Sequence, residues 1–340
     1  MPEHSFAPIE GSIERLIIDS GLLNNRLGDP TKREVIVHIP RQGLELIEQG
    51  GKLPVMIYLA PFTSSGLARA GWKAFAETLP QRHERLVNDE KMPPTILVLP
   101  DCFTSLGGNQ FVDSEIMGKW SSWLHKSLKP TIAERYSTNG KFALFGKSSG
   151  GYGALHNAIS HEGEWNAIAS HSGDVGFDVL YRSDFPTTAT QINQQGNLDN
   201  FLTHIKKCSK LSSDDFHALM ICAMAASYDS KEIHNTEISI RLPFDLETCT
   251  LDNTAWNNWL AFDPLNSIQK NTNSLNGLDL LYVDCGNKDQ YGIQYGSRKL
   301  IKILQKHGIE HHWEEFDGTH SGIEHRLDIS MPMLAKVLCD

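Results

Sequence analysis

The segment Gly146-Lys147-Ser148-Ser149-Gly150 places a serine in the pattern Gly-x-Ser-x-Gly. An apolar run, 142–145, comes directly before it, and a run rich in glycine, 151–155, follows it. This order predicts a strand, a sharp turn and a helix, with the Ser148 hydroxyl exposed on the turn as a nucleophile. Glycines permit such a turn because a Cβ at either flank would clash. The helix that follows would direct its positive end at charge developing beside the serine.

The triplet Gly146-Lys147-Ser148 also resembles the end of a phosphate-binding loop. That loop requires a further glycine at a fixed spacing before the last one, and the required position is Lys141, with Gly140 one residue too far back. The sequence therefore does not favour a nucleotide site here.

A serine hydroxyl needs a base within hydrogen-bond reach and an acid that orients the base. In folds with this turn the acid and then the histidine follow the serine along the chain. The run 280–289 ends an expected strand in a polar loop, and Asp289 is the predicted acid. Asp284 is the competitor, but it sits at the strand end, where bracing the loop is its expected role.

The predicted base is His320, in a polar loop directly after the expected strand 312–316. His311 and His312 begin that strand, at the wrong end of the sheet, and His325 is expected on the final helix. A single histidine is more often an ordinary surface or core residue. His320 is preferred because its position follows from that of Ser148.

The oxyanion formed during acyl transfer needs two backbone donors. One predicted donor is the amide of Ser149, and the other belongs to the loop after the third strand. Pro61 in that loop has no N–H. The second donor is therefore Phe62 or Thr63, of which Thr63 is favoured; an ordinary polar turn is the alternative.

Short β-rich runs recur along the chain and indicate the elements that would carry these residues. The expected strands are 16–18, 34–39, 55–60, 95–99, 142–145, 167–170, 280–283 and 312–316, and the expected helices between them include 71–86, 120–135 and 296–307. The middle runs are almost continuously apolar, which is typical of strands covered on both faces. This alternation predicts an α/β fold with a mostly parallel central sheet flanked by helices, and an antiparallel start because no helix separates the first two runs.

The region 181–276 interrupts the alternation, because it contains helical patterns and no convincing buried strand. We expect helices over 197–208, after a cap at Ser213, and after a cap at Thr254. Such an insertion is either a cap over the site or a structural elaboration. A cap is favoured, because the insertion precedes the strand that supplies the acid. Trp256 and Trp259 could wall the acyl group, although packing within the insertion is the simpler expectation.

Composition limits the function classes. The net charge of −10 argues against nucleic acid or an anionic membrane as the main partner. No apolar stretch predicts a membrane span, and the first residues lack the pattern of a secretory signal. The cysteines have neither disulfide-framework nor zinc-site spacing, and they lie at 102, 208, 222, 249, 285 and 339. We therefore expect a cytoplasmic protein with reduced thiols, without metal or cofactor, that is compatible with a homo-oligomer.

Taken together, several motifs resemble those of the putative esterase branch of the α/β-hydrolases, which includes esterase D, enterochelin esterases and mycolyltransferases. The motifs are 97–102, 113–114 with 118–120, 146–153, 171–174, and 284–286 with Asp289. The resemblance runs from about residue 53 to His320. It implies hydrolysis of an ester or thioester by Ser148, His320 and Asp289.

Two departures argue against a formylglutathione substrate. Esterase D-like enzymes usually have His and Met beside the nucleophile, where this chain has Lys147 and Ser149, and the loop with Pro61 and Phe62 lacks the usual glycine. The segments 100–101 and 171–174 are expected at the same sheet edge. They either line the pocket or only hydrogen-bond loops, and the second role is favoured.

The sequence thus predicts one α/β-hydrolase domain over 1–340 that acts as a serine carboxylesterase on a small-molecule ester. An acyltransferase would use the same residues but pass the acyl group to an alcohol. A hydrolase-fold binding protein without turnover is the alternative outside enzymes. The complete set of Ser148, Asp289 and His320 argues against it.

Overall fold

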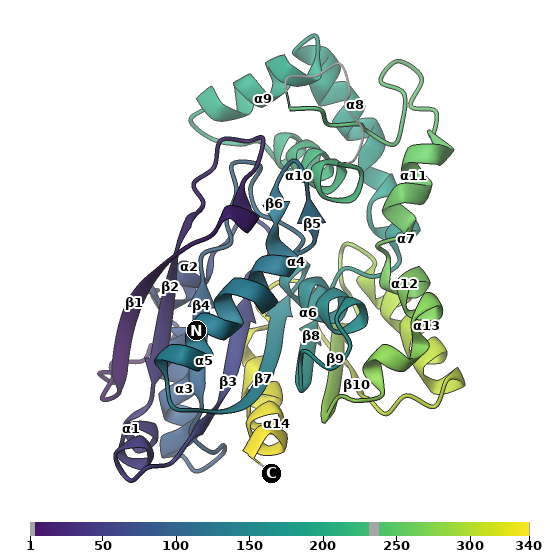
Figure 1. Ribbon diagram of the computed structural model, residues 1–340. Coiled ribbons are helices and arrows are strands. Elements are labelled where there is room, and N and C mark those ends of the chain that lie inside the picture. The colour runs from purple at the N-terminus through teal and green to yellow at the C-terminus, as the bar shows by residue number, and fades with distance from the viewer. Residues whose placement is uncertain (1–3, 231–237, 340) are drawn as a thin grey trace.

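The computed structural model describes residues 4–230 and 238–339. Its centre is an eight-stranded sheet in the order β1-β2-β4-β3-β7-β8-β9-β10 (Figure 1). The strands are β1 Ser12–Asp19, β2 Lys32–Ile39, β3 Leu53–Leu59, β4 Ile96–Pro100, β7 Thr138–Lys147, β8 Ala167–His171, β9 Leu280–Gly286 and β10 His312–Phe316. Each of these strands was expected from the sequence. A separate ribbon of β5 Asp113–Ser114 and β6 Gly118–Lys119 was not expected.

The sheet is mostly parallel, as predicted. Strands β3, β4 and β7 to β10 pair in parallel, whereas β2 pairs antiparallel with both β1 and β4. Strand β4 shows why the middle strands are almost continuously apolar in sequence, because its side chains alternate between two cores. Ile96 and Val98 pack into the core on one face, and Leu97 and Leu99 pack into the core on the other.

Helices cover both faces of this sheet. The α-helices of the described residues are α1 Arg41–Glu48, α2 Gly66–Ala70, α3 Leu79–Asn88, α4 Trp120–Trp123, α5 Lys129–Arg135, α6 Ser149–Ser160, α7 Phe177–Leu180, α8 Phe185–Gln194, α9 Leu198–Lys207, α10 Ser213–Tyr228, α11 Asn253–Leu260, α12 Pro264–Lys270, α13 Ile293–Lys306 and α14 Leu327–Cys339. One face packs against apolar side chains of α4, α5, α6 and α13, and the other against those of α3 and α14. None of these described helices is both long enough and apolar enough to cross a bilayer.

Two expected helices agree well with the structure and one does not. The expected helix 120–135 is α4 and α5 joined by a wider turn, Leu124–Leu128, and the expected helix 296–307 corresponds to α13, which starts three residues earlier and ends at Lys306. The expected helix 71–86 is wrong in its first half. Gly71 ends α2, and α3 starts only after Thr78, whose side chain caps it together with Gln81. The capping residues set this boundary, and the apolar pattern did not reveal it.

Helices also occupy most of the described part of 181–276, and α8 to α11 gather beyond one end of the sheet (Figure 1). The helix expected over 197–208 is α9, which Asn197 caps. The caps expected for the next two helices are wrong, because Ser212 rather than Ser213 caps α10 and Asp252 rather than Thr254 caps α11. Trp256 and Trp259 are buried in a third apolar cluster, which joins these helices to the strand ends.

The turn between β7 and α6 is held against the end of β3 by a very close backbone approach. A Cβ on Gly150 would lie 1.9 Å from the Leu59 carbonyl oxygen, and a Cβ on Gly146 would lie 2.4 Å from the same atom. The carbonyl oxygen that such a Cβ would meet belongs to the backbone of β3, which cannot move aside as the end of a flexible side chain could. The two glycines of the Gly-x-Ser-x-Gly pattern are therefore packing requirements of the fold.

We expect Gly150→Ala to lower the free energy of unfolding by about 3 kcal/mol or more, because either the helix or the strand must shift. Thermal and urea unfolding would measure the loss. The matched control is Gly277→Ala, where a Cβ meets nothing within 4 Å and the backbone needs no positive φ. Equal stability of the two variants would contradict the close approach.

Candidate active site

Ser148 lies on the sharp turn between β7 and α6. Its backbone has φ 55° and ψ −125°, a conformation that residues with a Cβ rarely adopt. The turn is fixed by the Ser148 amide, which donates to the His171 carbonyl at 2.9 Å. The side chain lines a cavity of about 160 Å³ at the carboxyl ends of the strands. This strained, half-buried position, with its side chain on a cavity, matches the turn predicted from the sequence.

The sequence left two candidates for the second oxyanion donor, the amides of Phe62 and Thr63 in the loop after β3, and the structure distinguishes them. The Thr63 amide donates to the Gly107 carbonyl at 2.6 Å, so it is not available to a ligand. Phe62, in contrast, lines the cavity with Ser148 and Ser149. Ser149 opens α6, where a first-turn amide has no acceptor within the helix. The structure thus favours Phe62 over Thr63, contrary to the preference drawn from the sequence.

Asp289 and His320 come together from the loops after β9 and β10. The Asp289 Oδ2 atom lies 2.8 Å from His320 Nδ1, and Oδ1 accepts the Tyr291 amide at 3.0 Å. The His320 amide donates to the Gln290 side chain at 3.0 Å, and the Tyr291 ring packs edge-on to the imidazole. The imidazole is therefore held by its own backbone, by a carboxylate and by an aromatic ring.

The other acid and histidines considered from the sequence lie elsewhere. Asp284 is fully buried and bonds to His171 and Arg326, each at 2.9 Å, which is the bracing role expected of it. His312 stacks on Tyr282 within the sheet. The remaining candidates, His311 and His325, bond to nearby backbone carbonyls.

Ser148, Lys147 and His320 line the same small cavity. The wall is completed by Pro61, Phe62, Ser149, Asp174, Leu180, Tyr181, Phe216, Met220, Tyr291 and Ile293. The Ser148 hydroxyl donates to Asp174 Oδ1 over 3.5 Å, and within the described residues it forms no hydrogen bond with His320. The structure thus brings a nucleophile candidate and a His–Asp pair to one cavity, with Asp174 as an additional acceptor.

Asp174 is the cavity residue that sequence reasoning undervalued. It follows β8 in the segment 171–174, for which hydrogen bonding to loops was the favoured role. That role does describe Asp101, whose carboxylate accepts a hydrogen bond from the Ser65 hydroxyl at 2.7 Å. Gly173 lets the chain pass so tightly that a Cβ there would lie 2.3 Å from Ser170 Oγ. A carboxylate three residues after the end of β8 was the available signal.

Asp174 is buried, with 5% of its surface exposed, and its Oδ2 atom accepts the Tyr181 hydroxyl at 2.9 Å. Burial raises its pKa from 3.8 to about 6, and the Tyr181 hydroxyl and the His320 charge oppose that rise. At neutral pH the cavity therefore contains a carboxylate charge that the fold holds at a cost.

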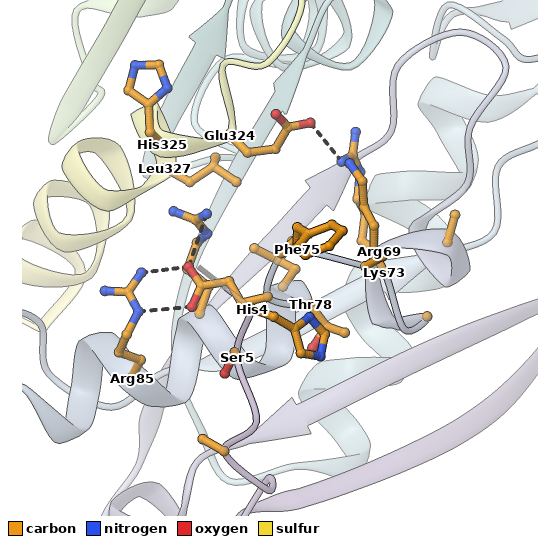
Figure 2. A pocket seen from close by; sticks show the side chains of 18 of the residues that line it. His4, Ser5, Arg69, Lys73, Phe75, Thr78, Arg85, Glu324, His325 and Leu327 are labelled. Atoms are coloured by element: carbon orange, nitrogen blue, oxygen red, sulfur yellow. Dashed lines mark hydrogen bonds and ion pairs between the residues drawn. The ribbon is translucent and has the colours of Figure 1, made fainter. Parts of the chain in front are cut away.

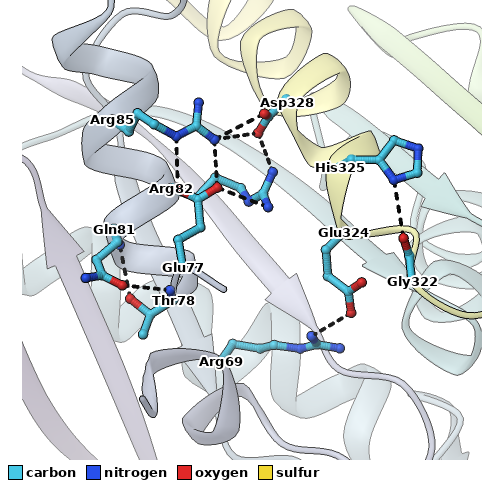
Figure 3. Close-up of polar contacts among 10 residues, drawn as sticks. All are labelled: Arg69, Glu77, Thr78, Gln81, Arg82, Arg85, Gly322, Glu324, His325 and Asp328. Carbon is cyan, nitrogen blue, oxygen red and sulfur yellow. Dashed lines mark hydrogen bonds and ion pairs between the residues drawn. The ribbon is translucent and has the colours of Figure 1, made fainter. Parts of the chain in front are cut away.

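A larger cavity, of about 1000 Å³, lies between α2, α3 and the segment after His320 (Figure 2). Ser148 does not line it. Its charged side chains largely pair with one another or with Asp328 nearby: Arg82 and Arg85 with Glu77 and Asp328, and Arg69 with Glu324 (Figure 3). The smaller cavity, which both Ser148 and His320 line, is therefore the candidate active site. In the described parts of the chain no three His, Cys, Asp or Glu side chains converge as metal ligands.

Comparison with known proteins gives a family match and several similar solved structures. A family model described as putative esterase matches residues 25–330. Among solved structures, a ferulic acid esterase is similar with a TM-score of 0.60 and 16% identity, over 97% of this chain and 100% of the other. An S-formylglutathione hydrolase from Agrobacterium tumefaciens has a TM-score of 0.58 and 14% identity, over 99% and 100%. At these identities the likeness shows a shared fold. No curated protein sequence matches.

Asp174 generates a prediction about stability. Its pKa in the fold, about 6, lies above its ordinary value of 3.8, so the ionised form destabilises the folded state. This penalty is present at pH above 6 and fades as the pH falls toward the ordinary value. We expect Asp174→Asn to raise the free energy of unfolding by roughly 2 to 3 kcal/mol at about pH 8, and by about 1 kcal/mol at about pH 4.5.

Urea unfolding of the wild-type protein and of the Asp174→Asn variant at the two pH values measures this gain in the free energy of unfolding. Asp178→Asn is the matched control, because its side chain is 58% exposed and lies outside the cavity. A destabilised Asp174→Asn protein at pH 8, with an unchanged control, would show that the carboxylate charge is not a burden on the fold.

Proposed function

This chain belongs to the putative esterase family, and from that premise we propose that it is a serine carboxylesterase that works through an acyl-enzyme on Ser148. The observation that carries the proposal is a shared cavity. The strained turn of Ser148 and the buried His320–Asp289 pair, which are distant in the chain, open onto the same 160 Å³. Its size suits a small acyl group.

In the proposed acylation, the Ser148 hydroxyl turns from Asp174 to His320 Nε2. Ser148 Oγ attacks the ester carbonyl carbon while its proton passes to the imidazole. The carbon–oxygen bond to the alcohol then breaks, and the leaving oxygen takes that proton. Asp289 keeps Nδ1 protonated and stabilises the imidazolium through the 2.8 Å contact.

Deacylation repeats these steps with water as the nucleophile. His320 takes a proton from water as the oxygen attacks the acyl carbon, and returns it to Ser148 as the acyl bond breaks. In both steps the negative oxygen is held by the amides of Ser149 and Phe62. Phe62 replaces Thr63 in this role, because the Thr63 amide is bonded to Gly107.

We also propose that the insertion 181–276 caps the site. Its side chains Tyr181, Phe216 and Met220 line the cavity, so this part of the insertion forms a wall of the space next to Ser148. Trp259 of α11 packs edge-on against the ring of Tyr181, and neither tryptophan of α11 lines the cavity itself.

Ser148→Ala tests the nucleophile. Removing a triad serine costs on the order of a millionfold in turnover, because attack and proton transfer are lost together. The readout is kcat with a short-chain nitrophenyl ester, and Ser321→Ala, an exposed serine in the His320 loop, is the control. Turnover by Ser148→Ala close to that of the control would exclude the mechanism.

The second oxyanion donor can be tested by removing the amide itself. Phe62→Pro eliminates the N–H, and we expect kcat to fall roughly a hundredfold or more below that of Phe62→Ala, which loses only the ring. Thermal unfolding of both variants establishes that each is folded at the assay temperature. Equal kcat values would remove Phe62 from the oxyanion site.

A further inference from the structure

The carboxylate of Asp174 differs from those of Asp284 and Asp289 in what surrounds it. Asp284 has Arg326 at 2.9 Å and Asp289 has His320 at 2.8 Å. Asp174 has two neutral hydroxyls, those of Tyr181 and Ser148. Within the described residues no lysine or arginine forms an ion pair with it, although Lys147 lines the same cavity. A buried carboxylate without a cation is costly, and a cationic ligand would relieve that cost.

The rest of the cavity wall indicates what else the ligand must contain. Beside Asp174 the wall carries apolar side chains, namely Leu180, Phe216, Met220 and Ile293. A ligand that fills about 160 Å³ here combines one charged group with a small apolar group. Both must lie close to the carbonyl that Ser148 attacks.

The 3.5 Å separation of Asp174 Oδ1 and Ser148 Oγ limits where the cation can be. A carbonyl carbon in position for attack lies about 3 to 3.5 Å from the nucleophile. An α-amino nitrogen is two bonds from that carbon, at about 2.5 Å, so it can reach Asp174 at the same time. The nitrogen of an amino-alcohol ester is at least four bonds from the carbonyl carbon and fits this separation less well.

We propose that the enzyme selects esters of small apolar α-amino acids, whose ammonium group binds Asp174. This rests on the proposed function and names its substrate class. The ammonium donates to Oδ1 in place of the Ser148 hydroxyl, which is thereby freed to donate to His320. Acylation then proceeds as above, with Ser148 Oγ gaining the carbonyl carbon and the alcohol leaving with the proton. Asp174 is a specificity residue that touches the substrate.

A series of three ethyl esters with acyl groups of similar size provides the test: 2-aminobutyrate, 2-hydroxybutyrate and butyrate. Acid release by the wild-type protein gives kcat/KM at about pH 7, where the amine is largely protonated. Each value is divided by the rate of that ester with hydroxide, because an α-amino group makes the carbonyl more reactive. We expect the amino ester to exceed butyrate by roughly tenfold or more, with the hydroxy ester between them.

The variant measurement uses the ratio of amino ester to butyrate, which does not depend on overall activity. Asp174→Asn should reduce this ratio roughly tenfold or more, whereas Asp178→Asn should leave it unchanged. A measurement without variants gives an independent check. Propylammonium should inhibit butyrate hydrolysis competitively and more strongly than 1-propanol does.

A wild-type ratio near one, or a ratio that Asp174→Asn does not change, would overturn the substrate class. Faster turnover of aminoethyl butyrate than of the 2-aminobutyrate ester would place the cation in the alcohol half and also overturn it. If butyrate turnover still depends on Ser148 in these cases, the proposed esterase function is retained and only the substrate class is lost. A folded protein inactive on every ester would overturn both.

Discussion

The contact between the backbone of α6 and the end of β3 is the constraint on which the site depends. Where a Cβ would come within 1.9 Å of a carbonyl oxygen, only glycine fits, and the chain turns sharply enough to give Ser148 its positive φ. That turn points a hydroxyl away from the sheet while leaving the first amides of α6 without helical partners. The proposed nucleophile and one proposed oxyanion donor thus both depend on how β3, β7 and α6 pack together.

A second constraint joins the loops after β9 and β10. A Cβ on Gly286 would lie 2.4 Å from the Gly318 carbonyl, and the amides of Asn287 and Lys288 donate to carbonyls of the neighbouring strand end and loop. These main-chain contacts hold Asp289 and His320 in register before any substrate arrives. Because two parallel strands end at the same sheet edge, the pair needs only short loops to face Ser148.

Asp174 shows how this site opposes stability. A carboxylate held in a pocket of apolar side chains and hydroxyls disfavours the folded state, and the fold retains it next to the nucleophile. Such a cost is typical of positions that serve binding rather than folding. The insertion contributes to both sides of this balance, because Tyr181 donates a hydrogen bond to the carboxylate while Phe216 and Met220 add apolar side chains to the cavity wall.

The sequence by itself predicted the strands and the loops after them that carry the proposed catalytic residues. Ser148, Asp289 and His320 are proposed because each follows an apolar run, and parallel strands bring such ends together. It did not determine which amide near Pro61 is available, since that depends on a bond from Thr63 to Gly107 in another loop. Nor did it place Asp174 against Ser148 or end α2 at Gly71. Those depend on contacts between segments distant in the chain, and local pattern carries no record of them, so only the tertiary structure decided them.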